Sequence, residues 1–250
     1  GIMYCLDALK GTQVWSTKVD KSVKGTPAFS PDGSLVLVGA DDGKLWAFDV
    51  VTGQSKWDRV PGTWKFVHCR PLCTKDRAYV GAGDGRVHAV DLANGEETWF
   101  YQTGGPVSGT VGMWNSNLVV GSEDGHLYLI DLDGKLKWKY KTDKGITGGA
   151  CISGDIAYFG NSGALHAVDL RQGKEAWPAP FLIARDTAIR GTPVVGDDAV
   201  YFGAADGALY AVEAKSGTLR WKYATGGPIM GSPALAGNGK NYIFVGSGDG

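Results

Sequence analysis

The sequence predicts an all-β protein built from many short antiparallel strands, and three observations support this fold class. Glycine supplies 39 of the 250 residues, which is about twice the ~7% share of an average protein. The chain also holds 9 Trp and 10 Tyr residues, and these residue types are typical of strands. Apolar residues show no helical 3.6-residue period, whereas one segment recurs along the whole chain. We therefore expect short strands joined by tight turns.

The recurring segment ends in tryptophan and carries an acidic residue and a glycine at similar distances before it. Its six copies end at Trp15, Trp57, Trp99, Trp138, Trp177 and Trp221, which lie 39 to 44 residues apart. The acidic residues precede a turn whose backbone amides can donate hydrogen bonds to them. They are Asp7, Asp49, Asp91, Asp131, Asp169 and Glu213. Because turn chemistry explains these acids, we assign them no catalytic role.

Two further signals accompany the tryptophan segments. An apolar run ending in glycine precedes an Asp-Gly pair at residues 42–43, 84–85, 124–125, 206–207 and 249–250, and another copy has Ser162-Gly163. Asp-Gly between apolar runs predicts a hairpin with a type I′ turn, in which both central residues have positive φ. Gly-Thr-Pro or Gly-Ser-Pro opens another short run at residues 25, 191 and 231. Each repeat thus contains four strands: A after this segment, B before Asp-Gly, C after Asp-Gly and D around the tryptophan.

Four antiparallel strands in each repeat match the blade of a β-propeller. Gly1 and Gly250 both occupy the repeat position of Gly43, so the chain spans six whole repeats. We therefore expect one domain, residues 1–250, that forms a six-bladed propeller of four-stranded antiparallel blades. The N- and C-terminal strands would share one blade, which closes the ring and removes unpaired sheet edges. Seven or eight blades would require additional sequence.

The six tryptophan segments resemble the tryptophan-docking motif of the PQQ-like (pyrroloquinoline quinone-type) β-propeller repeat family. This family includes quinoprotein dehydrogenases and non-enzymatic, BamB-like propellers. The resemblance covers the whole chain and implies that each tryptophan packs against the turn of a neighbouring blade. Physical reasoning agrees, since a buried indole offers about 150–250 Å² of apolar contact. We therefore interpret the six tryptophans as structural residues.

Charge and cysteine content exclude several classes of function. Lys plus Arg number 25 and Asp plus Glu 26, a net charge of −1, which argues against nucleic acid or an anionic membrane surface as the main partner. No apolar run reaches the roughly 18–20 residues of a membrane span. The 4 cysteines lack metal-ligand spacing, so we expect free thiols and predict no metal site.

His88 and His166 replace aromatic residues at one repeat position and are interpreted as core residues. The cellular compartment stays open.

Residues that break the repeat are the best candidates for function, because folding explains the shared ones. The interval from tryptophan to the next strand A is ten residues in four repeats, but twelve after Trp57 and fourteen after Trp177. These two repeats lie three apart in a ring of six, so their loops would face each other at the mouth of the central channel. The predicted ligand-binding residues there are Lys24, Trp64, Lys65, His68, Arg70, Arg185, Asp186 and Arg190.

The predicted mouth is mostly cationic, with Trp64 as a stacking surface, which suits a carboxylate, a phosphate or an acidic peptide. The alternative is that these residues are solvated loop charges paired with acids such as Asp186. No catalytic residues are predicted. The sequence leaves open the ligand, the parent protein, the oligomeric state and whether the chain is natural or engineered.

Two classes of function fit these observations. The first is a non-enzymatic interaction module that binds a peptide, a partner domain or a small anion at the mouth. The second is a quinoprotein-type dehydrogenase or quinone-binding propeller, for which the resemblance implies pyrroloquinoline quinone, Ca²⁺, eight blades and a disulfide between adjacent cysteines. This chain has six repeats, no Cys-Cys pair and cations where Ca²⁺ requires oxygen ligands. We therefore favour the interaction module without a cofactor and keep quinone binding as the alternative.

Overall fold

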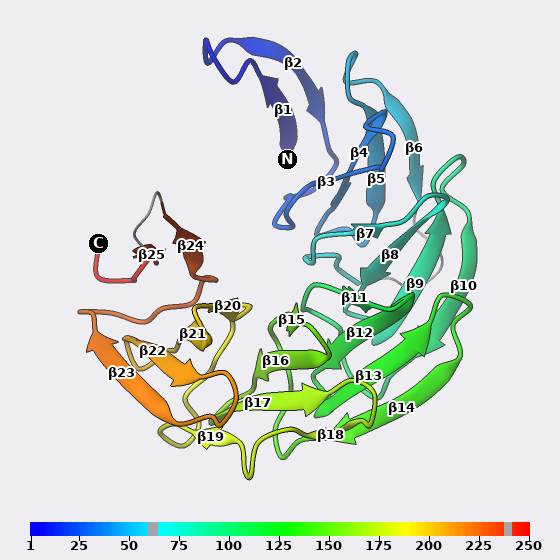
Figure 1. The fold of residues 1–250 in the computed structure, drawn as a ribbon. Helices are drawn as coiled ribbons and strands as arrows, with labels where there is room; N and C mark the ends of the chain where they lie inside the picture. The colour runs from blue at the N-terminus through cyan, green and yellow to red at the C-terminus, as the bar shows by residue number, and fades with distance from the viewer. Residues whose placement is uncertain (60–64, 238–241) are drawn as a thin grey trace. The chain divides into compact units, whose positions relative to one another are not determined.

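A computed structural model describes residues 1–59, 65–237 and 242–250 (Figure 1). Every regular element among these residues is a β-strand, which confirms the all-β prediction. The chain divides into two compact units, Gly1–Val111 and Gly112–Gly250. We call them the N-terminal and the C-terminal unit and describe each by itself.

The N-terminal unit contains one two-stranded and two four-stranded antiparallel sheets. The two-stranded sheet joins β1 (Ile2–Leu6) to β2 (Gln13–Lys18). The first four-stranded sheet consists of β3 (Ala28–Phe29), β4 (Leu35–Gly39), β5 (Leu45–Asp49) and β6 (Ser55–Arg59). The second consists of β7 (Leu72–Cys73), β8 (Arg77–Gly81), β9 (Arg86–Asp91) and β10 (Glu97–Gln102). Consecutive strands are neighbours in both sheets, as a propeller blade requires.

The C-terminal unit contains three complete sheets and one further strand pair. The first sheet consists of β11 (Gly112–Trp114), β12 (Asn117–Ser122), β13 (His126–Asp131) and β14 (Leu136–Lys141). The second consists of β15 (Cys151–Ser153), β16 (Ile156–Gly160), β17 (Ala164–Asp169) and β18 (Lys174–Glu175), with β19 (Phe181–Leu182) also on β17. The third consists of β20 (Val194–Gly196), β21 (Ala199–Gly203), β22 (Ala208–Glu213) and β23 (Leu219–Ala224). The last pair is β24 (Ala234–Ala236) with β25 (Tyr242–Phe244).

The sheet that the two chain ends were expected to share is not seen among the described residues. β1 pairs with β2 alone, and β24 pairs with β25 alone. Each pair therefore forms half a blade and keeps an edge without backbone hydrogen bonds. Apolar side chains on these halves stay in contact with solvent, since Tyr4 is 53% exposed and Phe244 is 59% exposed. The described residues thus form five complete sheets and two half sheets.

Four of the five predicted Asp-Gly hairpins form between strands B and C, at residues 42–43, 84–85, 124–125 and 206–207, but their turn geometry differs from type I′. At the first one, Gly43 has φ 80°, whereas Asp42 is not among the residues with positive φ. The Ala40 N–H donates to the Lys44 carbonyl at 3.1 Å, and the Gly43 N–H donates to the Ala40 carbonyl at 3.1 Å. This is the pattern of a type I turn followed by a glycine bulge. Two consecutive positive φ values occur instead at residues 115–116, with 43° and 57°, and at residues 197–198, with 51° and 58°.

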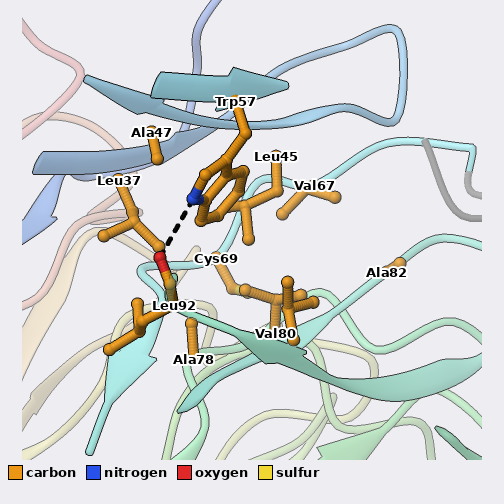
Figure 2. Packing of buried hydrophobic residues seen from close by; sticks show 11 residues of the cluster. Leu37, Leu45, Ala47, Trp57, Val67, Cys69, Ala78, Val80, Ala82 and Leu92 are labelled. Carbon is orange, nitrogen blue, oxygen red and sulfur yellow. Dashed lines mark hydrogen bonds between the residues drawn. The ribbon is translucent and has the colours of Figure 1, made fainter. Parts of the chain in front are cut away.

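Tryptophans connect successive sheets within each unit. Figure 2 shows Trp57 of β6 inside a buried cluster that includes residues of both four-stranded sheets of the N-terminal unit. Its Nε1 donates to the Leu92 carbonyl at 3.0 Å, the dashed line in the figure. The same bond recurs from Trp15 to Val50, from Trp138 to Leu170 and from Trp177 to Ala214, at 2.9 to 3.0 Å. Each indole thus packs on the turn that follows strand C of the next sheet.

Candidate functional site

The longer loop of the N-terminal unit holds most of the predicted site residues there. We call its described part, residues 65–70, the cation loop. Side chains of an extended segment alternate between its two faces, and here Val67 and Cys69 are buried, at 0% and 3% exposed. The Val67 N–H donates to the Ala40 carbonyl at 3.2 Å, which fixes the loop on the neighbouring hairpin. Lys65 and Arg70 are exposed as a result.

Lys24 and His68 are brought together by a carboxylate that the sequence analysis did not single out. The Lys24 Nζ lies 2.9 Å from Asp41 Oδ2, and the His68 Nε2 lies 2.5 Å from Asp41 Oδ1. The Lys24 ammonium, and after it the His68 ring, lower the pKa of the Asp41 carboxyl. Asp41 therefore compensates the charge of Lys24 and also holds the His68 ring in place.

Lys65 and Arg70 remain as cations without a carboxylate partner among the described residues. Between them, the Phe66 ring stacks on the His68 ring with centroids 4.5 Å apart and an interplanar angle of 21°. Phe66 also covers Gly83, where a Cβ would lie 2.4 Å from the Phe66 ring, so a larger residue at position 83 would require the ring to move. The cation loop thus presents two unpaired cations beside an ordered aromatic pair. Trp64, the predicted stacking residue, lies outside the described residues.

In the C-terminal unit, the predicted residues divide into a paired group and one unpaired cation. Asp186 accepts from Lys144 Nζ at 3.1 Å and lies 3.8 Å from Arg185 Nε. Arg185 is 91% exposed, so this ion pair is strongly screened. Arg190 is exposed and has no ion-pair partner in the described part of the chain. Sequence analysis missed Lys144, which is 42 residues from Asp186.

The two groups of cations belong to different units, and each is described only within its own unit. Pairing with Asp41 and Asp186 agrees with the alternative interpretation for Lys24, His68 and Arg185. The prediction that all of them line one channel mouth therefore stays a prediction. Among the residues that the structure describes, Lys65, Arg70 and Arg190 are the predicted cations for which no carboxylate lies within ion-pair distance.

The buried histidines make structural contacts, in line with their interpretation as core residues. His88 is fully buried, with Nδ1 2.5 Å from Glu97 Oε1 and Nε2 3.2 Å from Asp84 Oδ2. Burial lowers the pKa of His88 below its usual value. His166 is 4% exposed, with Nδ1 3.2 Å from Glu175. Neither ring lines an open surface, so neither is placed to act on a ligand.

The cysteines and the repeated acids offer no chemistry of a site either. All 4 cysteines are free thiols, and burial raises the pKa of Cys69 and Cys73 to about 11, which keeps both thiols protonated at neutral pH. Asp49 accepts from its turn amides, and the Thr52 amide, followed by the Lys56 ammonium, lowers the pKa of Asp49 to about 2. In the residues that the structure describes, no three His, Cys, Asp or Glu side chains are grouped to hold a metal ion.

Antiparallel four-stranded sheets that are connected by tryptophans place this chain in the class of β-propeller proteins. The family model described as outer membrane protein assembly factor BamB matches residues 1–99 and 60–250, which together cover the whole chain. The chain therefore belongs to this BamB-like family of PQQ-like repeats. A search of curated proteins finds no match.

Two solved structures resemble the whole fold. The crystal structure of BamB from Moraxella catarrhalis has a TM-score of 0.81 and 20% identity, and the match covers 100% of this chain and 78% of that one. The computationally designed Ika8 protein has a TM-score of 0.79 and 21% identity, and the match covers 96% of this chain and 73% of that one. At these identities the likeness shows a shared propeller-like fold. Over the described residues, no helix has the length and apolar character to cross a membrane.

Proposed function

We propose that this chain is a non-enzymatic, protein-binding β-propeller whose cation loop recognises an acidic peptide segment of its partner. The supporting observation is that Lys65 and Arg70 are exposed and without a carboxylate partner in the described residues, beside the stacked rings of Phe66 and His68. Cations next to an aromatic surface suit carboxylates flanked by apolar or aromatic residues. Membership of the BamB-like family supports a protein as the partner.

The finer architecture that we propose is the six-bladed ring, in which the half sheets at the two chain ends complete one blade. The complete four-stranded sheets and the two half sheets of the described residues support this number. In such a ring, Lys24, Arg185, Asp186 and Arg190 would belong to the same channel mouth as the cation loop. The acidic segment would then bind across this mouth.

A labelled peptide of alternating glutamate and phenylalanine tests the binding site. Each exposed charge is worth about 0.2–1 kcal/mol, so changing Lys65 and Arg70 together to Ala should weaken binding roughly 2- to 30-fold. Changing the exposed Lys139 and Lys141 of β14 removes the same charge elsewhere and should leave the affinity unchanged. The affinity should also fall as salt is added, because exposed charges are screened.

Equal losses in both double variants would contradict the site, because they would show that only net charge matters. Pyrroloquinoline quinone provides the test of the alternative function, since it is a tricarboxylate that could bind the same cations. Micromolar quenching of tryptophan fluorescence that Arg190→Ala abolishes would favour a quinone-binding propeller over a protein-binding one.

A further inference from the structure

The outermost strand of the second sheet in the C-terminal unit is interrupted. β18 pairs with the C-terminal end of β17, and β19 pairs with its N-terminal end. Between them, positions 176–180 read Ala-Trp-Pro-Ala-Pro. Proline has no N–H to donate to a neighbouring strand, so Pro178 and Pro180 do not continue the ladder. The long interval that the sequence shows after Trp177 therefore begins with a broken outer strand.

A glutamate side chain takes part of the place of the missing strand. The Ala167 N–H donates to Glu175 Oε1 at 2.8 Å, whereas the equivalent residue of the next sheet, Ala211, pairs with the repeat tryptophan of strand D. Glu175 Oε2 accepts from the Tyr140 hydroxyl at 2.7 Å. Both oxygens of this carboxylate are therefore engaged by donors of the protein itself. Trp177 lies outside the strand, although its indole keeps the contact with the next sheet.

A cavity of about 430 Å³ lies beside the interruption, between this sheet and the turn after β22; we call it the Trp177 pocket. Its apolar lining residues are Ile156, Tyr158, Ala176, Trp177 and Ala214. The Tyr158 hydroxyl and the Trp177 Nε1 both donate to the Ala214 carbonyl, at 3.0 and 2.9 Å, so the two rings are held in place. Binding pockets for small molecules have volumes of about 300–1,000 Å³. The Trp177 pocket therefore has room for a small organic molecule.

A cavity at the equivalent place in the N-terminal unit shows what the interruption changes. It lies between the first four-stranded sheet and the turn after β9, and its volume is about 280 Å³. None of its described lining residues belongs to β6, the outer strand of that sheet, whereas residues 174–177 line the Trp177 pocket. Three carboxylates, those of Asp32, Asp76 and Asp91, line the smaller cavity. The two cavities thus differ in size and in charge.

Two lysines supply the available charge at the Trp177 pocket. Its two acids are engaged, because Asp169 accepts from Arg171 Nη2 at 2.8 Å and Glu175 binds the donors described above. Lys174 and Lys215 are exposed, and no carboxylate of the described residues lies within ion-pair distance of either ammonium. Lys174 belongs to β18, and Lys215 belongs to the turn after β22 of the next sheet. An anion between the two sheets would therefore meet one cation from each of them.

We propose that the Trp177 pocket binds a small aromatic carboxylate, with its ring against Tyr158 and Trp177 and its carboxylate between the two lysines. The aromatic body is inferred from the lining, since rings pack favourably against tyrosine and tryptophan. The negative charge is inferred from Lys174 and Lys215, which provide ammonium groups without a competing acid. This site lies entirely within the C-terminal unit, so it is separate from the cation loop and goes beyond the proposed protein-binding function.

Titration of the isotope-labelled protein with naphthoate, followed by two-dimensional NMR spectra, tests the site. Amide and indole N–H signals of residues 156–158, 174–177 and 214–215 should shift and saturate, with a dissociation constant of about 1 mM or lower for a ligand of this size. Naphthamide has the same ring without the charge and should bind roughly 2- to 30-fold more weakly. Lys174→Ala with Lys215→Ala should weaken naphthoate binding by a similar factor and leave naphthamide binding unchanged.

Lys139→Ala with Lys141→Ala is the matched control, because it removes two exposed charges from β14 of the same unit. The control should bind naphthoate as the original protein does. The inference would be overturned by a control that loses as much affinity as the Lys174 and Lys215 variant, by equal affinities for naphthoate and naphthamide, or by the absence of saturable shifts at these residues.

The double variant of Lys65 and Arg70 separates this site from the proposed function. It should leave naphthoate binding unchanged, because the cation loop belongs to the other unit. Loss of naphthoate binding in that variant, with binding retained in the Lys174 and Lys215 variant, would place the ligand at the cation loop and overturn the inference. Failure of naphthoate to bind would leave the acidic-peptide experiment unaffected.

Discussion

Replacing Trp57 measures how strongly one sheet is bound to the next. Its indole is 6% exposed and donates to the Leu92 carbonyl at 3.0 Å (Figure 2). Removal of a buried tryptophan side chain costs about 3–5 kcal/mol, so Trp57→Ala should lower the free energy of unfolding by roughly that amount. Trp57→Phe keeps much of the apolar contact but leaves the carbonyl without its donor, which costs about 1–3 kcal/mol.

Urea unfolding followed by circular dichroism provides the assay, because it does not depend on the fluorescence of the tryptophan that is removed. Phe100→Ala is the control, since Phe100 is a large aromatic residue that is 47% exposed; it should cost less than about 1.5 kcal/mol. The reasoning would be refuted if Trp57→Ala cost no more than this control. It would also be refuted if Trp57→Phe cost as much as Trp57→Ala, because the ring contact would then contribute nothing.

Two further predictions concern close packing and pH. Gly203→Ala places a Cβ 2.0 Å from Ile229 and should lower the free energy of unfolding by about 1–3 kcal/mol. The control is Gly231→Ala, where a Cβ meets nothing within 4 Å, and it should change the free energy of unfolding by less than about 0.5 kcal/mol. Equal unfolding midpoints for the two variants would contradict this prediction. Burial lowers the pKa of His88 in the folded state, so the unfolded chain takes up a proton at a higher pH than the folded chain does. The free energy of unfolding should therefore decline as the pH falls below about 6.5, the pKa of histidine in the unfolded chain. His88→Tyr, which supplies the tyrosine found at this repeat position in other sheets, should reduce that decline when urea unfolding is measured at several pH values. If the variant loses stability with falling pH as steeply as the original protein, His88 is not the cause.

The strands and their order were predictable because the sequence signals of each strand recur in several copies of the repeat. Trp57 and its equivalents are informative only as a series, since one isolated tryptophan has no assigned neighbour. The contacts of Trp15, Trp57, Trp138 and Trp177 with the next turn agree with this interpretation. Repetition therefore carried the fold prediction further than local propensity alone would have done.

The charge pairing at the candidate site was not predictable in the same way. Asp41 binds Lys24 and His68 from 17 and 27 residues away in sequence, and nothing in the repeat marks it as their partner. The Phe66 ring packs on Gly83, a residue of another loop, in the space that a side chain at position 83 would occupy. These contacts follow from how loops fold over one another, so the sequence indicated which segments were unusual but not which of their charges were compensated.

The pairing of the chain ends was also beyond the sequence pattern. Repeat counting treats Gly1 and Gly250 as equivalent positions, but it contains no information on the edge hydrogen bonds that would join the two half sheets. The structure leaves β1 and β25 in separate sheets.

The proposed ring is tested most directly by comparing Trp221→Ala with Trp177→Ala in the same urea titration. Trp177 is 4% exposed and bonded to Ala214 at 2.9 Å, so its loss should cost about 3–5 kcal/mol. If the proposed ring is closed, Trp221→Ala should cost as much to within about 1 kcal/mol, because closure would bury Trp221 as Trp177 is buried. A cost for Trp221→Ala below about 1.5 kcal/mol, the value of an exposed aromatic residue, would contradict the closed six-bladed ring.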